Sequence, residues 1–209
     1  IIKNADFNVG LETLNNCPKL EDITIEEVPN YEGDFPDLSK LLKLENLNLI
    51  KIKFNGMINE ISNPKLETLI LENISWNDKN KLPKFPKSIE CLKIEYNQFQ
   101  NSPLESIDDE VLNDSFAECY KLRSLRLVRF TNIIGTKLYN LFQSEELKYI
   151  TLNGFKNLIG LPCLNESLES FEMVNSKILN LDFLKNTIYI KELDLLASLD
   201  LKDITQLKY

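Results

Sequence analysis

The stretch Leu122-Arg123-Ser124-Leu125-Arg126-Leu127 has apolar residues at its first, fourth and sixth places, and this spacing returns along the whole chain. Ile, Phe or Met replaces Leu in some copies. Eight copies begin at Leu20, Leu44, Leu66, Ile89, Leu122, Leu147, Leu168 and Ile190. Their starts lie 24, 22, 23, 33, 25, 21 and 22 residues apart, and self-similarity at such a period indicates a solenoid of stacked units.

We number positions from the first apolar residue of each unit, so the other two apolar residues stand at +3 and +5. Because they alternate with polar residues, each unit predicts a short β-strand with +3 and +5 facing inward. The roughly 16 residues between strands are too many for a hairpin and enough for a crossover, which predicts parallel strands. Apolar residues at helical spacing between strands, as at Leu138, Leu141 and Phe142, predict short helices or turns. We therefore expect one α/β solenoid over residues 1–209, with about eight parallel strands on a concave face and short helices or turns on the convex face.

The repeated pattern resembles the leucine-rich-repeat superfamily, and the resemblance covers essentially the whole chain. It implies a horseshoe-shaped solenoid that recognises a protein partner through its concave face. The asparagine that this family carries at +8 stands only at Asn97. Six other units have Val28, Ile52, Ile74, Phe130, Phe155 or Ser176 at +8. This departure favours a degenerate, intracellular type of array over an extracellular receptor.

Cys17 and Cys119 each stand three places before a unit, as in C-x-x-L-x-x-L-x-L. This spacing resembles the cysteine-containing repeats of F-box substrate receptors, and it implies the substrate-recognition part of a ubiquitin ligase. The alternative is that both cysteines are simply small buried residues. No F-box helix sequence occurs within these residues.

The composition excludes several classes of function. The chain has 24 basic and 32 acidic side chains, a net charge of −8 and a pI near 4.8, which argues against sequence-independent nucleic-acid binding. It has no histidine, which removes Ser-His-Asp and Cys-His nucleophile pairs and histidine-ligated zinc. No phosphate-binding, dinucleotide-binding or metalloprotease motif occurs, so we expect no enzymatic activity, no cofactor and no metal site.

The four cysteines are widely separated and contain no C-x-x-C, so a disulfide framework is not expected and a reducing compartment, cytoplasmic or nuclear, is the simpler interpretation. The sequence contains no run of about 18 apolar residues, so it predicts no membrane span. Three N-glycosylation sequons, at Asn73, Asn113 and Asn165, are no more than chance would give in a chain this rich in asparagine. They keep open an alternative function, that of an extracellular or cell-surface ectodomain for recognition or adhesion.

Both ends of the sequence fall inside the repeat pattern. Ile2 matches the +5 position of an earlier strand, and Leu207-Lys208-Tyr209 repeats the opening Leu147-Lys148-Tyr149 of a later one. A solenoid needs capping units at its ends, and neither end of the sequence provides one. We therefore expect an array truncated at both ends, whose partners include other domains of the same longer chain.

The outward positions +2, +4 and +6 predict a face that binds a protein partner. Glutamates occupy +1 in the first four units, whereas Arg123 and Lys148 occupy it in the next two, so the face has an acidic and a basic part. Such a division could orient a charged partner, or the charges could serve solubility alone. The candidate partner-binding residues are Glu26, Glu72, Glu95, Tyr96, Arg123, Arg126, Arg129 and Tyr149.

The unit of 33 residues carries the most individual feature. Ser102 and Glu105 form a capping box around Pro103, and an apolar stripe runs from Leu104 to Tyr120, which together predict a full helix. This helix is either an enlarged convex segment or an acidic docking helix.

Overall fold

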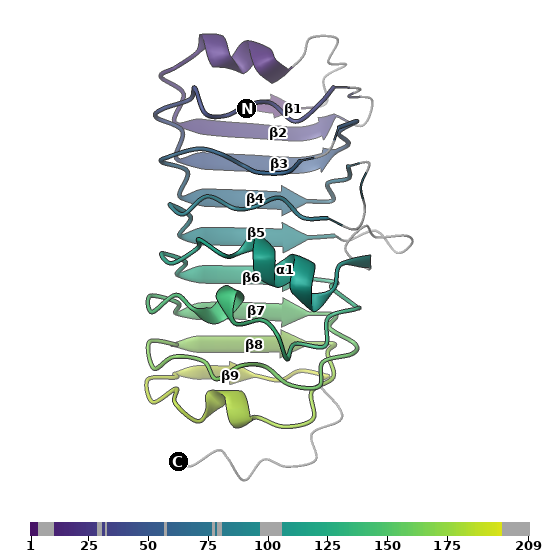
Figure 1. Ribbon diagram of the computed structural model, residues 1–209, viewed down its shortest axis with the longest axis vertical. Helices are drawn as coiled ribbons and strands as arrows, with labels where there is room; N and C mark the ends of the chain where they lie inside the picture. Colours follow the sequence, from purple (N-terminus) through teal and green to yellow (C-terminus); the bar gives the residue numbers. More distant parts are fainter. Residues whose placement is uncertain are drawn as a thin grey trace.

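The computed structural model describes residues 1–3, 11–28, 31, 33–56, 58–76, 78, 81–96 and 106–197. In this part of the chain one parallel sheet holds nine strands in sequence order (Figure 1). They are β1 (Ile2–Lys3), β2 (Asp22–Val28), β3 (Asn46–Ile52), β4 (Thr68–Glu72), β5 (Cys91–Glu95), β6 (Ser124–Val128), β7 (Tyr149–Asn153), β8 (Ser170–Val174) and β9 (Glu192–Asp194). Strands β2 to β9 are those of the eight units. Strand β1 is the earlier strand predicted at Ile2, and Ile2 pairs with Ile25 in β2. The predicted α/β solenoid is confirmed.

The strands stack in one register from unit to unit. Leu125 in β6, for example, pairs with Leu92 in β5 and with Ile150 in β7, all at +3. The carbonyl at +1 anchors each step: that of Glu90 accepts the N–H groups of Arg123 at 2.7 Å and of Ser124 at 3.0 Å. Because a slip by one residue would turn every leucine toward solvent, the apolar pattern fixes this register.

The core is one continuous cluster under the sheet. The residues at +3 and +5 are buried in every unit from β2 to β8, and large apolar side chains at +8 fill the space behind them. Phe130 and Phe155, both at +8, stack with ring centroids 5.9 Å apart, so the aromatic packing also runs from unit to unit. Ser176 at +8 instead accepts a hydrogen bond from the backbone N–H of Phe155 at 3.0 Å. Each unit therefore buries its apolar side chains only against its neighbours, as expected of a solenoid.

A left-handed backbone turn ends the strands at +7. Seven +7 residues have φ between 48° and 77°: Glu27, Lys51, Asn73, Arg129, Gly154, Asn175 and Ala197. Only one of the seven is glycine, although this conformation costs residues with a Cβ roughly 1–2 kcal/mol each. The stacked neighbours therefore hold the corner in place against its local preference.

Within the described residues, the segments that return from one strand to the next cross the same face of the sheet (Figure 1). They include the short helices η1 (Leu11–Asn16), α1 (Asp109–Ser115), η3 (Asn140–Phe142) and η4 (Asp182–Leu184). The helical spacing at 138–142 thus gives η3. None of the helices in the described ranges is long and apolar enough to cross a bilayer.

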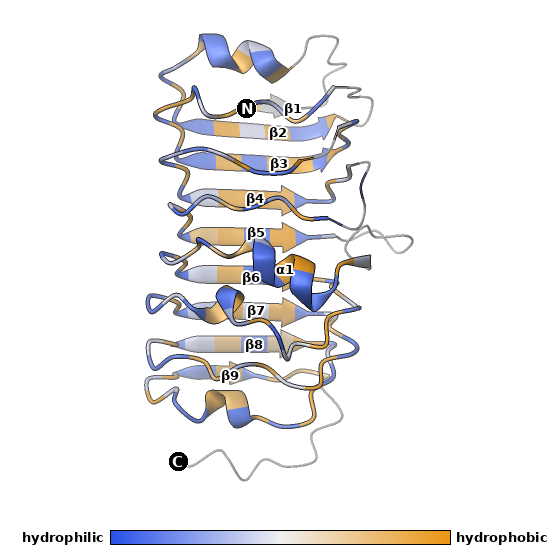
Figure 2. Ribbon diagram, in the orientation of Figure 1, coloured by the Kyte–Doolittle hydropathy of each residue, from blue (hydrophilic) through white to orange (hydrophobic). Residues whose placement is uncertain are grey.

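The helix of the long unit differs from the prediction. It begins at Asp109, because the side chain of Asp108 accepts the Val111 N–H at 3.0 Å and caps it there, and it ends before Tyr120, which is 59% exposed. The predicted capping box at Ser102 lies outside the described residues. Figure 2 shows that α1 has both hydrophilic and apolar residues, as the sequence pattern requires.

The buried carboxylate of Asp109 joins α1 to the next unit. Its Oδ1 accepts the N–H groups of Ile134 at 2.8 Å and of Gly135 at 3.0 Å, and its Oδ2 accepts that of Lys137 at 3.2 Å. One helical turn later, Asn113 Oδ1 accepts the N–H of Asn140 at 2.7 Å. The helix thus provides side-chain acceptors for the irregular backbone at residues 134–137 and for Asn140, the first residue of η3.

Candidate functional site

The candidate site is the face of the sheet opposite the return segments, which we call the open face. It consists of the outward side chains at +2, +4 and +6, and their partial exposure alternates with the buried +3 and +5 residues along each strand. In register, the +4 row runs Thr24, Asn48, Ile70, Lys93, Arg126, Thr151, Glu172 and Asp194. None of the return segments in the described part of the chain crosses this surface in Figure 1.

An ion-pair network occupies the middle of the open face. Lys93 Nζ lies 3.1 Å from Glu72 Oε2 and 2.9 Å from Glu95 Oε2. Arg126 Nε lies 3.3 Å from the same Glu95 oxygen, and its Nη1 lies 3.9 Å from Glu172 Oε2. Burial alone would lower the pKa of Lys93, but hydrogen bonds to Glu95 and Glu72 outweigh it and raise the pKa. The positive charges of this region are therefore already balanced within the solenoid.

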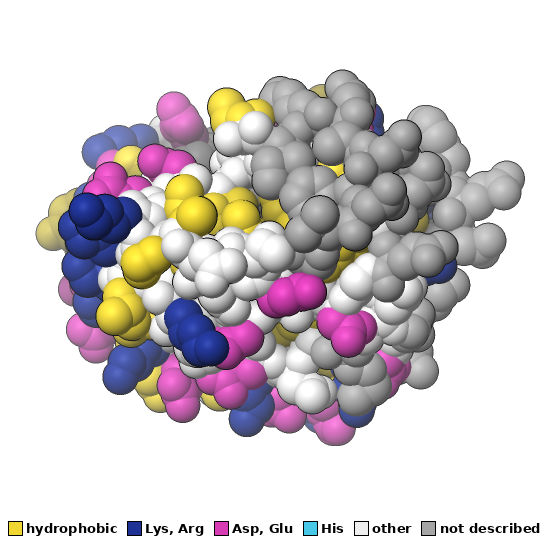
Figure 3. Space-filling view, turned by 90° about the horizontal axis from the view of Figure 1, so that it is seen from above, with side chains coloured by type: hydrophobic (Ala, Val, Ile, Leu, Met, Phe, Trp, Pro, Cys, Tyr) yellow, Lys and Arg dark blue, Asp and Glu magenta, His cyan; other side chains and the backbone are white. Residues whose placement is uncertain are grey.

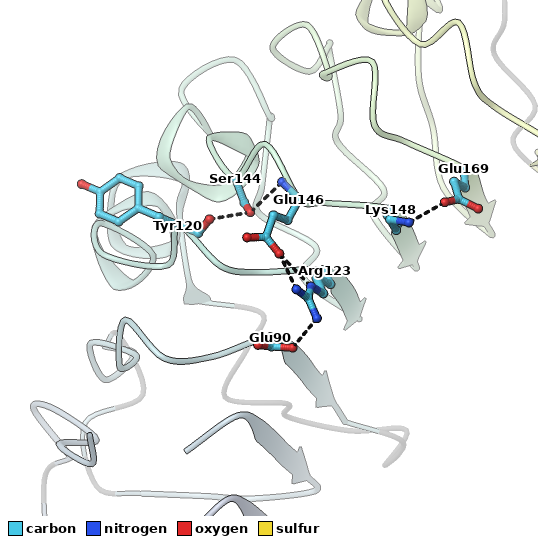
Figure 4. Close-up of polar contacts among 7 residues, drawn as sticks. All are labelled: Glu90, Tyr120, Arg123, Ser144, Glu146, Lys148 and Glu169. Atoms are coloured by element: carbon cyan, nitrogen blue, oxygen red, sulfur yellow. Dashed lines mark hydrogen bonds and ion pairs between the residues drawn. The ribbon is translucent and has the colours of Figure 1, made fainter. Parts of the chain in front are cut away.

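Arg123 lies beside this network, on what we call the leading edge of the sheet, the row of +1 side chains where the strands begin. Its guanidinium contacts Glu146 at 2.7 Å and Glu90 at 2.9 Å (Figure 4). The hydrogen bond to Glu146 and the charge of Glu90 raise its pKa. Close to Arg123, the hydroxyl of Ser144 donates to the carbonyl of Tyr120 at 2.8 Å.

The leading edge continues with a second bridged group. Glu169 accepts hydrogen bonds from Lys148 at 2.8 Å and from Lys191 at 2.7 Å, and these bonds lower its pKa to about 2. Lysines and a glutamate thus alternate over three successive units.

The basic part predicted around Arg123, Arg126 and Arg129 is not a free basic surface. Arg123 lies on the leading edge, Arg126 on the open face, and each is bound by two carboxylates. Arg129 lies at the +7 corner with φ 70°, and its N–H donates to the carbonyl of Asn153 at 2.7 Å. The three arginines therefore belong to three different rows.

The remaining predicted residues divide between surface and core. Glu26, Glu72 and Glu95 lie in the +6 row, where Glu72 and Glu95 are register partners. Tyr149 is 49% exposed on the open face. Tyr96 is only 8% exposed, so the expectation that it anchors a partner on this face is wrong. In this unit the inward alternation of the strand carries on to +7, whereas the left-handed turn redirects the +7 side chains of the other units.

The first units have a different leading edge, which the sequence reasoning did not fully resolve. Glu21, Glu45 and Glu67 are exposed and make no ion pair with any cation in the described ranges. A lysine precedes each by two residues, in the triplets Lys19-Leu20-Glu21, Lys43-Leu44-Glu45 and Lys65-Leu66-Glu67. The recurring K-L-E triplet is the signal that could have revealed these parallel rows. Figure 3 shows acidic and basic side chains gathered at the left, where the strands begin.

Among the described residues no group of three His, Cys, Asp or Glu side chains is arranged to hold a metal ion. Comparison of the sequence with protein-family models and with curated proteins gives no match. The function is therefore inferred from the geometry of the open face.

Proposed function

We propose that this chain is a protein-interaction module that binds its partner over the open face. The observation that supports this is an uninterrupted surface of eight adjacent strands, β2 to β9, with the return segments on the other side of the sheet. At a strand spacing of about 4.8 Å and a width of about 16 Å, this surface measures about 600 Å². A partner in a stable complex contributes about 800 Å², so the open face supplies most of one interface.

We further propose, on the resemblance to leucine-rich repeats, that the module is the substrate-recognition part of an F-box-type ubiquitin-ligase receptor in the cytoplasm or nucleus. The position three places before each unit supports this narrower proposal. There Cys119 Sγ lies 4.0 Å from the carbonyl of Phe85, and Ser144 and Asn165 likewise donate to carbonyls of the preceding unit. A thiol, hydroxyl or amide is thus used at this place as an inter-unit donor.

Two of the sequons favour this reading over the cell-surface ectodomain. The side-chain amide of Asn165 donates to the carbonyl of Ser144, and that of Asn113 accepts the N–H of Asn140. A glycan on Asn165 would occupy the nitrogen that makes this hydrogen bond, and a glycan on Asn113 would crowd the backbone that its oxygen binds.

Site-specific photocrosslinking in the source organism tests the proposal. A photoreactive residue replaces Ser170 on the open face, and a matched control replaces the exposed Lys185, which follows η4 on the return side. We expect a partner crosslinked at Ser170 but not at Lys185. Recovery of ubiquitin-ligase adaptor subunits with it would support the receptor, whereas cell-surface components would support the ectodomain. Crosslinks formed only at Lys185 would overturn the open face as the binding surface.

A further inference from the structure

The dipeptide Asn-Gly occurs twice in the chain, as Asn55-Gly56 and as Asn153-Gly154. Asparagine is one of the thermolabile residues, because the backbone nitrogen of the next residue can attack its side-chain amide. Glycine in that next place has no Cβ to hinder the approach. The attack still requires the glycine nitrogen to turn toward the asparagine Cγ, so the backbone around each dipeptide decides whether it reacts.

Asn153-Gly154 is held in the sheet. Asn153 ends β7 and pairs with Val128 on one side and with Val174 on the other. Its carbonyl accepts the N–H of Arg129 at 2.7 Å, and the N–H of Gly154 donates to the carbonyl of Val174 at 2.9 Å. The attacking nitrogen is therefore occupied, and it is released only when this part of the sheet opens.

At Asn55-Gly56 the hydrogen-bonded backbone ends one residue earlier. The N–H of Phe54 donates to the carbonyl of Ser75 at 2.8 Å, and that of Asn55 donates to the carbonyl of Gly33 at 3.0 Å. No acceptor in the described ranges lies within hydrogen-bond distance of the Gly56 N–H, and Asn55 is exposed. The two dipeptides thus have the same chemistry in opposite backbone settings.

We propose that Asn55 is a site of spontaneous deamidation in the folded protein and that Asn153 is protected from it. The Gly56 nitrogen gives its proton to water and bonds to Cγ of Asn55, the bond from Cγ to Nδ2 breaks, and Nδ2 takes up a proton and leaves as ammonia. The succinimide ring that forms then takes up water at one of its two carbonyl carbons. Opening at Cγ gives aspartate, and opening at the main-chain carbonyl gives isoaspartate. The net reaction converts an amide and water into a carboxylate and ammonium, and no electron is transferred.

The product changes the corner between the first two units. Gly56 lies against the side chain of Asp34, since a Cβ on this glycine would be 2.5 Å from Asp34 Oδ1. A carboxylate at position 55 adds a like charge beside Asp34. Isoaspartate also lengthens the main chain by one carbon atom at the residue whose N–H is bound to Gly33. We therefore expect the aged chain to be less stable than the fresh one.

Peptide mapping of the purified chain tests this inference. The folded chain is incubated in mildly alkaline buffer and digested with trypsin, and mass spectrometry follows the mass gain at Asn55 in peptide 54–65 and at Asn153 in peptide 149–156. We expect conversion at Asn55 to be at least about tenfold faster, because Asn153 reacts only after local opening. The same incubation in urea should bring the two rates close together, because both asparagines then precede glycine in an unfolded chain.

The variant Asn55→Gln is the matched control, since its longer side chain keeps the amide but forms a cyclic product far more slowly. It should remove most of the conversion in peptide 54–65. Its urea midpoint should stay unchanged on ageing while that of the wild type falls.

A smaller difference between Asn55 and Asn153 in the folded chain would overturn the assignment. A difference that persists in urea would also overturn it, because the local sequence and not the fold would then set the two rates. An unchanged wild-type midpoint after conversion would overturn the expected loss of stability.

Discussion

Replacing Asp109 with Ala should be among the most destabilising single changes in this chain. The substitution removes three hydrogen bonds to the N–H groups of Ile134, Gly135 and Lys137, of which that of Gly135 is buried. A stranded buried donor costs about 1–3 kcal/mol, and each lost bond to a charged acceptor in a partly wet place costs somewhat less, so the total is about 3–5 kcal/mol. Asp109→Asn keeps the Oδ1 acceptor and turns an amide N–H toward Lys137, which should cost about 1–2 kcal/mol.

Urea unfolding followed by circular dichroism measures the loss of stability in Asp109→Ala and in Asp109→Asn. Hydrogen exchange shows which part of the chain is destabilised. The amides of Ile134, Gly135 and Lys137 should lose protection in Asp109→Ala, while those in β3 should change little, because the units interact mainly with their nearest neighbours. A loss below about 1 kcal/mol, or unchanged exchange at these amides, would refute the view that α1 holds the next segment through this carboxylate.

Three further outcomes check other parts of the structure. Gly135→Ala should cost at least about 2 kcal/mol in thermal or urea unfolding, because its φ is 89° and the new Cβ would lie 2.1 Å from the carbonyl oxygen of Gly160; a neutral effect would contradict this packing. Glu169, whose hydrogen bonds to two lysines lower its pKa from 4.5 to about 2, should stabilise the fold above pH 4.5 and lose that contribution as the pH falls toward 2; an NMR titration of its carboxyl with an ordinary midpoint would exclude the bridges. Burial raises the pKa of Cys119 to about 12, so at pH 8 a thiol reagent should modify the exposed Cys17 rapidly and Cys119 only after unfolding; rapid native-state reaction of Cys119 would contradict its place in the core.

The sequence predicts what depends on the period and little of what depends on lateral neighbours. The inward leucines, the parallel register and the early strand at Ile2 all follow from one repeated spacing, because each unit can be buried only by stacking in phase. The ion pairs do not follow from it: Arg126 reaches Glu95 in the preceding strand and Glu172 two strands ahead, so its partners are visible only when the rows are assembled.

Local backbone conformation explains the two predictions that the structure corrects, the exposure of Tyr96 and the start of the helix in the long unit. Tyr96 was expected to anchor a partner on the open face, but its unit lacks the left-handed turn that the other units have at +7, so its side chain lies in the core. The helix of the long unit was expected to begin at Pro103, but within the described residues the side chain of Asp108 caps it at Asp109. Both outcomes depend on single backbone conformations, which an apolar period cannot specify.

The direction of the hydrogen bonds between units has a mechanical consequence. They run along the length of the solenoid, because the strands lie across it (Figure 1). A force that pulls the two ends apart therefore stretches these bonds lengthwise, and rows open one after another instead of sharing the load in shear. At about 3.5 Å per residue, the unit of 33 residues would release about 115 Å of chain and a unit of 21 residues about 75 Å. The protein would behave as an extensible tether whose steps of lengthening differ from unit to unit.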